Sequence, residues 1–263
     1  MTLCVTYAVG NRAVGLADSL LTTISRRDDT GSFLPTDQEI RHQTPFGVKV
    51  HLITESAAYS HYTIDILTAI AGNVSLGLQC TLHVESYLKY GLNRWLHDFR
   101  MDIMHKVSDF WSDARDQQLQ MSFTLYDHKR RAHIFEYGAD ENGEFSFHEV
   151  EDHYGFKLSI LGDGKERAKE EIMSSINCLL YEHDLEDAVH MSCVSALKNR
   201  INDKSELFIG GYMQGAVLNQ YSGRYLVVAS GVKCFRAAEL DDYDQLDLPV
   251  LDLMASGFPI LPK

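Results

Sequence analysis

The stretch that decides the fold opens the chain and reads MTLCVTYAVGNRAVGLADS (residues 1–19). Residues 2–9 alternate in character and are rich in β-formers, a Gly-Asn pair supplies a two-residue turn, and the residues after it are again β-forming. Two such runs separated by a short turn are typical of a β-hairpin. Because the two ends of a hairpin meet, the sequence predicts that Asp18 returns to the side of Thr2.

Thr2 is a candidate nucleophile. Threonine is small enough for the methionine before it to be removed, and removal would leave Thr2 with a free α-amine beside its own hydroxyl. The hydroxyl needs a neighbouring base, and an α-amine with an ordinary pKa of about 7.7–8.0 suits that task. Threonine activated by its own amine is an established form of covalent catalysis. The alternative is a plain hairpin in which Asp18 only caps a turn.

Two further positions would complete such a site. Lys49 interrupts the apolar run FGVKVHLI, so it lies either on an outer surface or in the interior as an ammonium paired with Asp18. In the second case its charge would favour loss of the Thr2 hydroxyl proton and keep the amine neutral. Gly72 ends the run AIAG before a predicted helix. It either makes a turn or presents its N–H group to a developing oxyanion.

The composition predicts a globular protein with one domain over residues 1–263. The chain is 45% hydrophobic and has no repeat or long linker, and its mean hydropathy is −0.19. This length allows a sizeable core. The net charge of −13 argues against a nucleic-acid partner, which favours a basic surface. No run of about 18 apolar residues is present, so we expect no membrane span. The first residues do not resemble a secretory signal, and we expect a cytoplasmic location.

The cysteines and histidines do not predict a metal site. The five cysteines are an odd number without close pairs, as expected for reduced thiols inside a cytosolic protein. Zinc-type Cys spacing and HExxH are both missing from the sequence. We therefore expect neither a metal nor another cofactor.

The pattern along the chain alternates blocks of strands with pairs of helices. Strands are predicted at 2–9, 12–19, 46–54, 63–72, 121–128, 131–138, 145–150, 155–162, 205–213, 216–222 and 224–231. Helices are predicted over 75–114, as a pair broken near Asn93, over 165–183, and from Leu185 to Leu197. Residues 26–45 are polar, contain two prolines and are expected to form a long loop.

This order favours an α+β fold, a four-layer αββα sandwich of two antiparallel sheets flanked by helix pairs. A doubly wound parallel sheet fits less well, because it needs single crossover helices between its strands.

Together these features resemble the proteasome β-subunit family of N-terminal nucleophile (Ntn) hydrolases, in its bacterial proteasome-related branch. The resemblance follows the order of elements along nearly the whole chain, and it is carried by Thr2, GLADS (15–19), VKVHLI (48–53), AIAGN (69–73) and SILGDGKERAKEEI (159–172). It implies the Ntn-hydrolase fold, a threonine-type peptidase or amidase acting on a peptide or protein substrate, and self-association into a ring or spiral homo-oligomer. It does not identify an ATPase partner.

The resemblance also implies roles for single residues. The catalytic set would be Thr2, Asp18, Lys49 and Gly72, with Asp163 where the family has an amine-binding serine and with Asn202 and Ser205 where it has an Asp-x-x-Ser pair. The substrate pocket would be lined by Leu21, Thr22, Gly47, His51, Ile70, Val74 and Leu78. This lining is mostly apolar, so an apolar residue is expected before the cleaved bond.

Four alternatives remain open on the sequence. Asp163 and Asn202 favour a catalytically silent subunit with an assembly or binding role, and the same chemistry would also serve an amidase on small amides. The run SILGDGKERA resembles a phosphate-binding loop, but Ser159 and Glu166 replace two residues that the motif requires. Cys4 is a further candidate nucleophile, although its apolar strand suggests a buried thiol.

Overall fold

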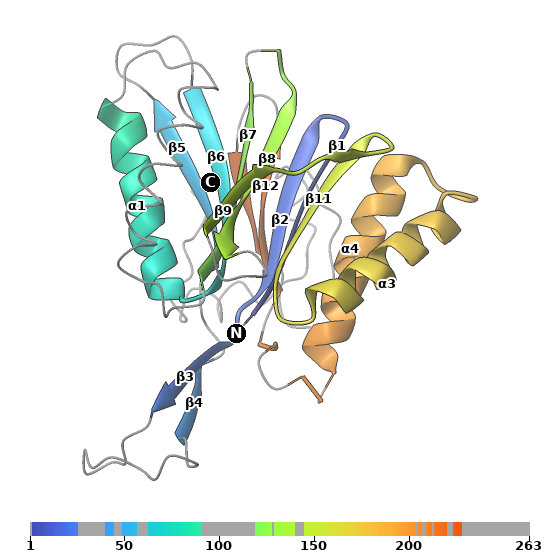
Figure 1. Cartoon of the computed structure of the whole chain (residues 1–263). Coiled ribbons are helices and arrows are strands. Elements are labelled where there is room, and N and C mark those ends of the chain that lie inside the picture. The colour runs from blue at the N-terminus through green and yellow to red at the C-terminus, as the bar shows by residue number, and fades with distance from the viewer. Residues whose placement is uncertain are drawn as a thin grey trace.

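The computed structural model describes residues 2–25, 40–44, 49–56, 63–90, 119–127, 129–139, 145–203, 205–206, 209–211, 213–219 and 223–227. In these residues two antiparallel sheets lie next to each other, with helices on their outer sides (Figure 1). No helix in the described part of the chain combines the length and apolar character needed to cross a bilayer.

The first sheet is built around the predicted N-terminal hairpin. Its six strands run in the order β10 (Asp152–His153), β11 (Phe156–Gly162), β1 (Leu3–Val9), β2 (Arg12–Asp18), β12 (Met213–Asn219) and β13 (Gly223–Val227). The hairpin prediction is confirmed, because β1 pairs with β2 and Cys4 stands opposite Ala17. This register places Asp18 beside the start of β1.

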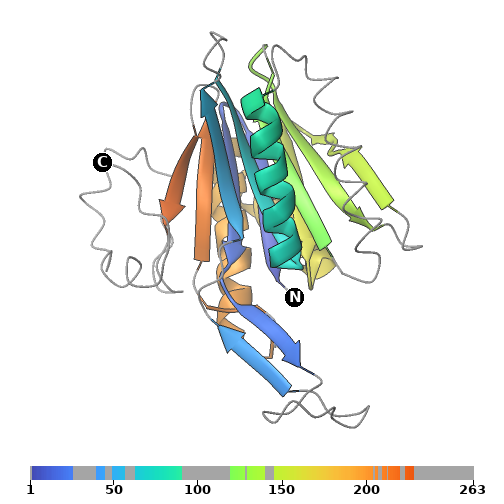
Figure 2. The ribbon, with the colours of Figure 1, turned by 90° about the vertical axis from the view of Figure 1, so that its left-hand side faces the viewer.

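The second sheet contains β5 (Val50–Ser56), β6 (Thr63–Gly72), β7 (Leu119–Tyr126), β8 (Ala132–Ala139) and β9 (Phe145–Glu149), in that order. A separate ribbon, β3 (Leu21–Ser25) with β4 (Ile40–Thr44), extends away from both sheets (Figures 1 and 2). The loop expected over 26–45 was therefore wrong at residues 40–44, which pair with β3. Its remaining residues lie outside the described ranges.

Helices cover the outer faces of the two sheets. The helices α3 (Lys165–Leu179) and α4 (Leu185–Asn202) pack on the first sheet, and α1 (Val74–Tyr90) packs on the second (Figure 1). The second helix expected within 75–114 falls in residues 91–118, outside the described part. The strand predicted at 205–213 was wrong for residues 209–211, because β12 begins only at Met213.

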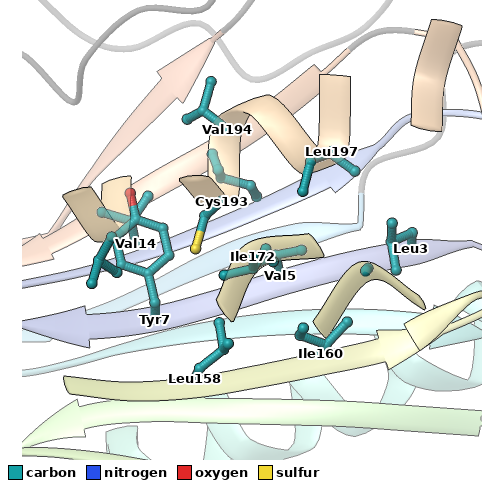
Figure 3. Close-up of a cluster of buried hydrophobic side chains, with 14 of the residues drawn as sticks. Leu3, Val5, Tyr7, Val14, Leu158, Ile160, Ile172, Cys193, Val194 and Leu197 are labelled. Carbon is teal, nitrogen blue, oxygen red and sulfur yellow. The ribbon is translucent and has the colours of Figure 1, made fainter. Parts of the chain in front are cut away.

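Alternation along β1 explains why all seven of its residues are buried. Leu3, Val5 and Tyr7 point toward α3 and α4, where they join a hydrophobic cluster that is drawn in Figure 3. Cys4 and Ala8 belong to the cluster between the two sheets. Side chains of successive strand residues face opposite sides, so a strand covered on both faces must be apolar at nearly every position.

Small residues allow the two sheets to approach closely. The cluster between them contains alanines from both sheets, and a Cβ atom at Gly15 would lie only 3.2 Å from Leu67 Cδ2. Polar links also cross between the sheets: Thr6 Oγ lies 3.1 Å from Ser122 Oγ. At the end remote from Thr2, Lys157 Nζ lies 2.7 Å from Glu149 Oε1.

Leu16 tests the packing between β2 and the helices. Its side chain is 0% exposed, so Leu16→Ala should lower the free energy of unfolding by about 2–5 kcal/mol because it leaves a cavity. Leu82, on α1, is 60% exposed, and Leu82→Ala is the matched control with an expected change within about 0.5 kcal/mol. Urea denaturation measures both, and equal losses would contradict the burial of Leu16.

Asp127 provides a test in acid. Burial by itself raises the pKa of its carboxyl, but hydrogen bonds from Arg131 and His133 outweigh burial and hold the pKa at about 2. Because the folded pKa lies below the ordinary 3.8, the carboxylate stabilises the fold above that pH, and the gain is lost as the pH falls toward 2. Asp127→Asn should therefore lower the melting temperature at pH 7 and lose this effect in acid. A difference that does not change with pH would contradict the assignment.

Candidate active site

The hairpin and the start of β5 bring Thr2, Asp18 and Lys49 together. The Thr2 hydroxyl donates to Asp18 Oδ1 and accepts from Lys49 Nζ. The Lys49 ammonium also lies 3.0 Å from Asp18 Oδ2. All three residues are buried, with exposed fractions of 1%, 0% and 0%. Of the two interpretations of Lys49, the structure supports the interior ammonium.

Lys49 Nζ has three acceptors: Thr2 Oγ, Asp18 Oδ2 at 3.0 Å and the Leu20 carbonyl at 2.6 Å. A lysine ammonium carries three N–H donors and no acceptor, so each N–H group has a partner. Burial of a charge is costly unless the charge is paired and hydrogen-bonded. The pocket therefore fits a charged Lys49 directly beside the threonine oxygen.

The Asp18 carboxylate is equally well satisfied. Besides the Thr2 hydroxyl, Oδ1 accepts from the Leu3 N–H at 2.9 Å. The other oxygen, Oδ2, accepts from Lys49 and from the N–H groups of Leu20 and Gly210, both at 3.2 Å. Donors reach both oxygens, which suits an ionised, acceptor-only carboxylate. This arrangement fixes Asp18 and, through it, the rotamer of Thr2.

The turn after β11 holds the main chain of Thr2. The Asp163 N–H donates to the Thr2 carbonyl at 2.8 Å, and the Gly162 N–H donates to Gln120 Oε1 at 2.7 Å. Gly162 has φ +95°, and a Cβ atom there would stand 1.7 Å from the Thr2 carbonyl oxygen. Only glycine fits this position, because the backbone is left-handed there and the Thr2 carbonyl oxygen occupies the space of a Cβ atom.

The same contacts weaken the phosphate-loop interpretation. A phosphate loop uses its free backbone N–H groups to hold the anion. Here the N–H groups of Gly162 and Asp163 are bound to Gln120 and to Thr2. Gly162 of this turn therefore packs on the N-terminal strand at Thr2.

Asp163 stands where the resemblance expects an amine-binding serine. Burial raises the pKa of its carboxyl, and the negative charges of Glu206 and Asp18 act in the same direction. Its main chain contacts Thr2, as described above, whereas its half-buried side chain has no hydrogen bond among the described residues. A role for this side chain stays a prediction.

Asn202 and Ser205 lie apart from this hydrogen-bond network. Asn202 ends α4 and is exposed, and the exposed Ser205 hydroxyl donates to Asp203 Oδ1 at 2.6 Å. Within the described residues, neither is hydrogen-bonded to Thr2. Glu206 Oε1 is 4.0 Å from the Cβ position of Gly164, and its charge acts on the Asp163 carboxyl. The catalytic role of Asn202 and Ser205 stays a prediction without support from these contacts.

The expected pocket residues that the structure describes fall on four elements. Leu21 and Thr22 begin β3, His51 lies on β5, and Ile70, Val74 and Leu78 lie at the end of β6 and the start of α1. Ile70 is fully buried against α1, and Val74 and Leu78 pack against the same cluster. Gly47 lies outside the described residues. Gly72 ends β6 with φ +88°, a left-handed conformation that glycine tolerates. Whether these residues bind a substrate stays a prediction.

Cys4 does not fit the role of a nucleophile. Burial raises the pKa of its thiol to about 12, and its Sγ donates to the Ile70 carbonyl at 3.2 Å. The thiolate is the reactive form of cysteine, so this thiol is inert near neutral pH. Among the described residues, moreover, no group of three or more His, Cys, Asp or Glu side chains converges as a metal site requires.

Sequence reasoning missed four residues that support the site. Leu20 and Gly210 act through backbone groups, for which side-chain patterns give no signal. Gln120 and Gln214 act through their side chains, which contact Gly162 and the main chains of Asp18 and Lys49. The only available signal was a lone glutamine at the start of each of two apolar strands.

No protein-family model matches this sequence, and no curated protein matches it either. Solved structures of Anbu do resemble it. Anbu from Yersinia bercovieri, described as an ancestral β-subunit, has a TM-score of 0.57 at 12% identity over 99% of both chains. A Gly-1 mutant of Anbu from Hyphomicrobium sp. strain MC1 has a TM-score of 0.56 at 10% identity over 100% of both chains.

The Anbu complex from Pseudomonas aeruginosa, solved as a helical assembly, has a TM-score of 0.55 at 13% identity. The match covers 100% of this chain and 99% of that one. Identities this low show the fold alone. The chain thus shares its α+β fold with Anbu, which agrees with the sequence resemblance at the level of the fold.

Gly162 and Gly164 offer a matched pair of variants. Both have positive φ, but only at Gly162 would a Cβ atom collide with backbone, whereas the nearest atom to a Cβ at Gly164 is 4.0 Å away. Gly164→Ala should cost about 1–2 kcal/mol from backbone strain. Gly162→Ala should cost more, because the collision displaces Thr2. Chemical denaturation measures both, and equal losses would show that Gly162 does not pack on Thr2.

Proposed function

We propose that this protein is a threonine hydrolase that cleaves peptide or amide bonds through an acyl-enzyme, as a proteasome-like Ntn hydrolase with a single four-layer αββα domain over residues 1–263. The observation that carries the proposal is the buried triad of Thr2, Asp18 and Lys49. The Thr2 hydroxyl lies between the Lys49 ammonium and the Asp18 carboxylate, and hydrogen-bond donors reach both oxygens of that carboxylate. A threonine kept only for packing would need neither charge.

The proposed reaction begins with removal of Met1, since Thr2 follows it in the sequence and its nitrogen is otherwise an amide. The freed α-amine takes the Thr2 hydroxyl proton through a water, and Oγ attacks the scissile carbonyl. Lys49 stabilises the negative charge that develops on Oγ, and Asp18 holds Lys49 in place. The N–H of Gly72 is assigned to the oxyanion.

The tetrahedral intermediate then collapses. The C–N bond breaks, and the α-ammonium returns the proton to the leaving amine, which leaves an ester between the acyl group and Thr2. A water, deprotonated by the α-amine, hydrolyses this ester and regenerates the free hydroxyl. We assign to the Asp163 carboxyl the role of accepting from the ammonium form of the amine.

The substrate and the assembly extend the same proposal. Leu21 begins β3, whereas Val74 and Leu78 lie at the start of α1, and all three are half-buried. We assign them to the contact with an apolar side chain before the scissile bond. We assign His51 and Thr22 to the same pocket. Self-association is supported by the likeness to an Anbu complex that was solved as a helical assembly.

A second candidate is a catalytically silent subunit of the same fold. The observation that favours it is Asp163, because a carboxylate close to the amine would stabilise the charged ammonium and weaken it as a base. The two candidates differ in whether Thr2 reacts.

Chemical labelling of Thr2 separates them. The purified protein should lack the mass of Met1 and should gain the mass of a threonine-directed peptide epoxyketone. Thr2→Ala should abolish this labelling and lower peptide turnover on the order of 10³-fold or more, because the nucleophile is lost. Thr2→Ser, which keeps a hydroxyl, is the matched control and should still be labelled. Intact-mass spectrometry and peptide turnover are the measurements, and turnover by Thr2→Ala at the wild-type rate would exclude the mechanism.

A further inference from the structure

We propose that Gln214 is a positioning residue for Thr2, and that it acts by fixing the main chain of Lys49 to the main chain of Asp18. The inference rests on the proposed function of Thr2 and deepens it. Gln214 lies on β12 and is 5% exposed. It has no hydrogen bond to Thr2 among the described residues, so its effect passes through Lys49 and Asp18.

The Gln214 amide joins the two sheets at the site. Its Oε1 accepts from the Lys49 N–H at 2.9 Å and lies 3.4 Å from the Val50 nitrogen. Its Nε2 donates to the Asp18 carbonyl at 3.2 Å. Asp18 ends β2 of the first sheet, whereas Lys49 immediately precedes β5 of the second. One side chain therefore sets the spacing between the two halves of the ion pair.

The sheets hold both ends of this link. On one side, β12 pairs with β2 so that Gln214 stands opposite Ala17, next to Asp18. On the other side, the Lys49 carbonyl accepts from the Ile70 N–H at 2.8 Å, which ties Lys49 to β6. Among the described strands β5 lies at the edge of its sheet, and the Lys49 N–H donates to Gln214 Oε1 instead of to a strand partner. Both backbone polar groups of Lys49 are thereby satisfied.

The position of the Lys49 main chain matters because its side chain is long. A lysine side chain has many rotamers, so a fixed main chain limits the arrangements in which its ammonium contacts Thr2, Asp18 and Leu20 together. A displacement of about 1 Å at a reacting group can cost on the order of a hundredfold in rate. The hydrogen bonds of Gln214 thus give it a role in positioning Lys49 that packing alone does not explain.

A second glutamine makes a comparable link on the other side of Thr2. Gln120 lies on β7 of the second sheet, and its Oε1 accepts from the Gly162 N–H of the first sheet at 2.7 Å. It supports the turn that holds the Thr2 carbonyl. Gln214 is the glutamine that supports the charged pair, so the inference assigns the electrostatic effect to Gln214.

The experiment uses the full-length protein and the peptide epoxyketone as probe. Gln214→Met keeps the length and volume of the side chain but loses its hydrogen bonds, and Gln214→Asn, too short to reach the Lys49 N–H, is the second variant. Ser122→Ala is the matched control, because it removes the buried link to Thr6 between the same two sheets without touching Lys49 or Asp18.

We expect both Gln214 variants to label about tenfold to a hundredfold more slowly than the wild type. Their labelling should also need a higher pH. The charge of Lys49 keeps the α-amine of Thr2 neutral, and in these variants the Lys49 ammonium is no longer held beside Thr2. The other charged groups near Thr2, Asp18 and Asp163, are unchanged in these variants. Hydrogen exchange of the Lys49 and Val50 amides should be faster, whereas Ser122→Ala should label at the wild-type rate and pH.

Three outcomes would overturn the inference. The first is wild-type labelling with an unchanged pH dependence in Gln214→Met or Gln214→Asn. The second is equal slowing in Ser122→Ala, which would indicate a general loss of stability. The third is wild-type exchange of the Lys49 and Val50 amides in the Gln214 variants. An unlabelled wild type is a different result: it overturns the proposed function before any variant is compared.

Discussion

The buried ion pair between Lys49 and Asp18 is the constraint on which the rest of the site depends. Two charges with exposed fractions of 0% would destabilise the fold if either lost its partner. Direct contacts offset the loss of hydration: each N–H group of the Lys49 ammonium has an acceptor, and donors reach both oxygens of the Asp18 carboxylate. The Thr2 hydroxyl is one of these contacts, so the arrangement that makes the pair tolerable also orients the candidate nucleophile.

The two-sheet architecture explains why the pair lies where it does. Asp18 comes from the first sheet and Lys49 from the second, so the pair forms only if the sheets meet in one register and at one spacing. Small residues between the sheets permit that spacing. At the site itself, Gly162 and the side chains of Gln120 and Gln214 fix it by contacts to main-chain groups. The geometry of the candidate site is therefore a property of the sheet interface rather than of one loop.

The chemistry of the site favours an oxygen nucleophile over the other candidates. Cys4 is close to the charged pair, yet burial raises the pKa of its thiol too far for a thiolate. In the glycine turn before α3, two N–H groups donate to Gln120 and Thr2. These two groups are therefore not free to bind an anion such as a phosphate. Asp163 is the departure closest to Thr2, because its N–H donates to the Thr2 carbonyl, and burial raises the pKa of its carboxyl.

The sequence alone determined the hairpin, most of the described strands and helices, and the return of Asp18 to Thr2, because these follow from nearest-neighbour patterns of period 2 and 3.6. It also singled out Lys49 as a charge in an apolar run, but left its burial undecided. It did not predict the β3–β4 ribbon. Only the tertiary structure decided that Lys49 faces Asp18, that Gly162 closes on the Thr2 carbonyl, and that Leu20, Gly210 and Gln214 complete the site. These contacts join residues up to 196 positions apart, often through backbone atoms, and a pattern of side chains carries no information about such pairs.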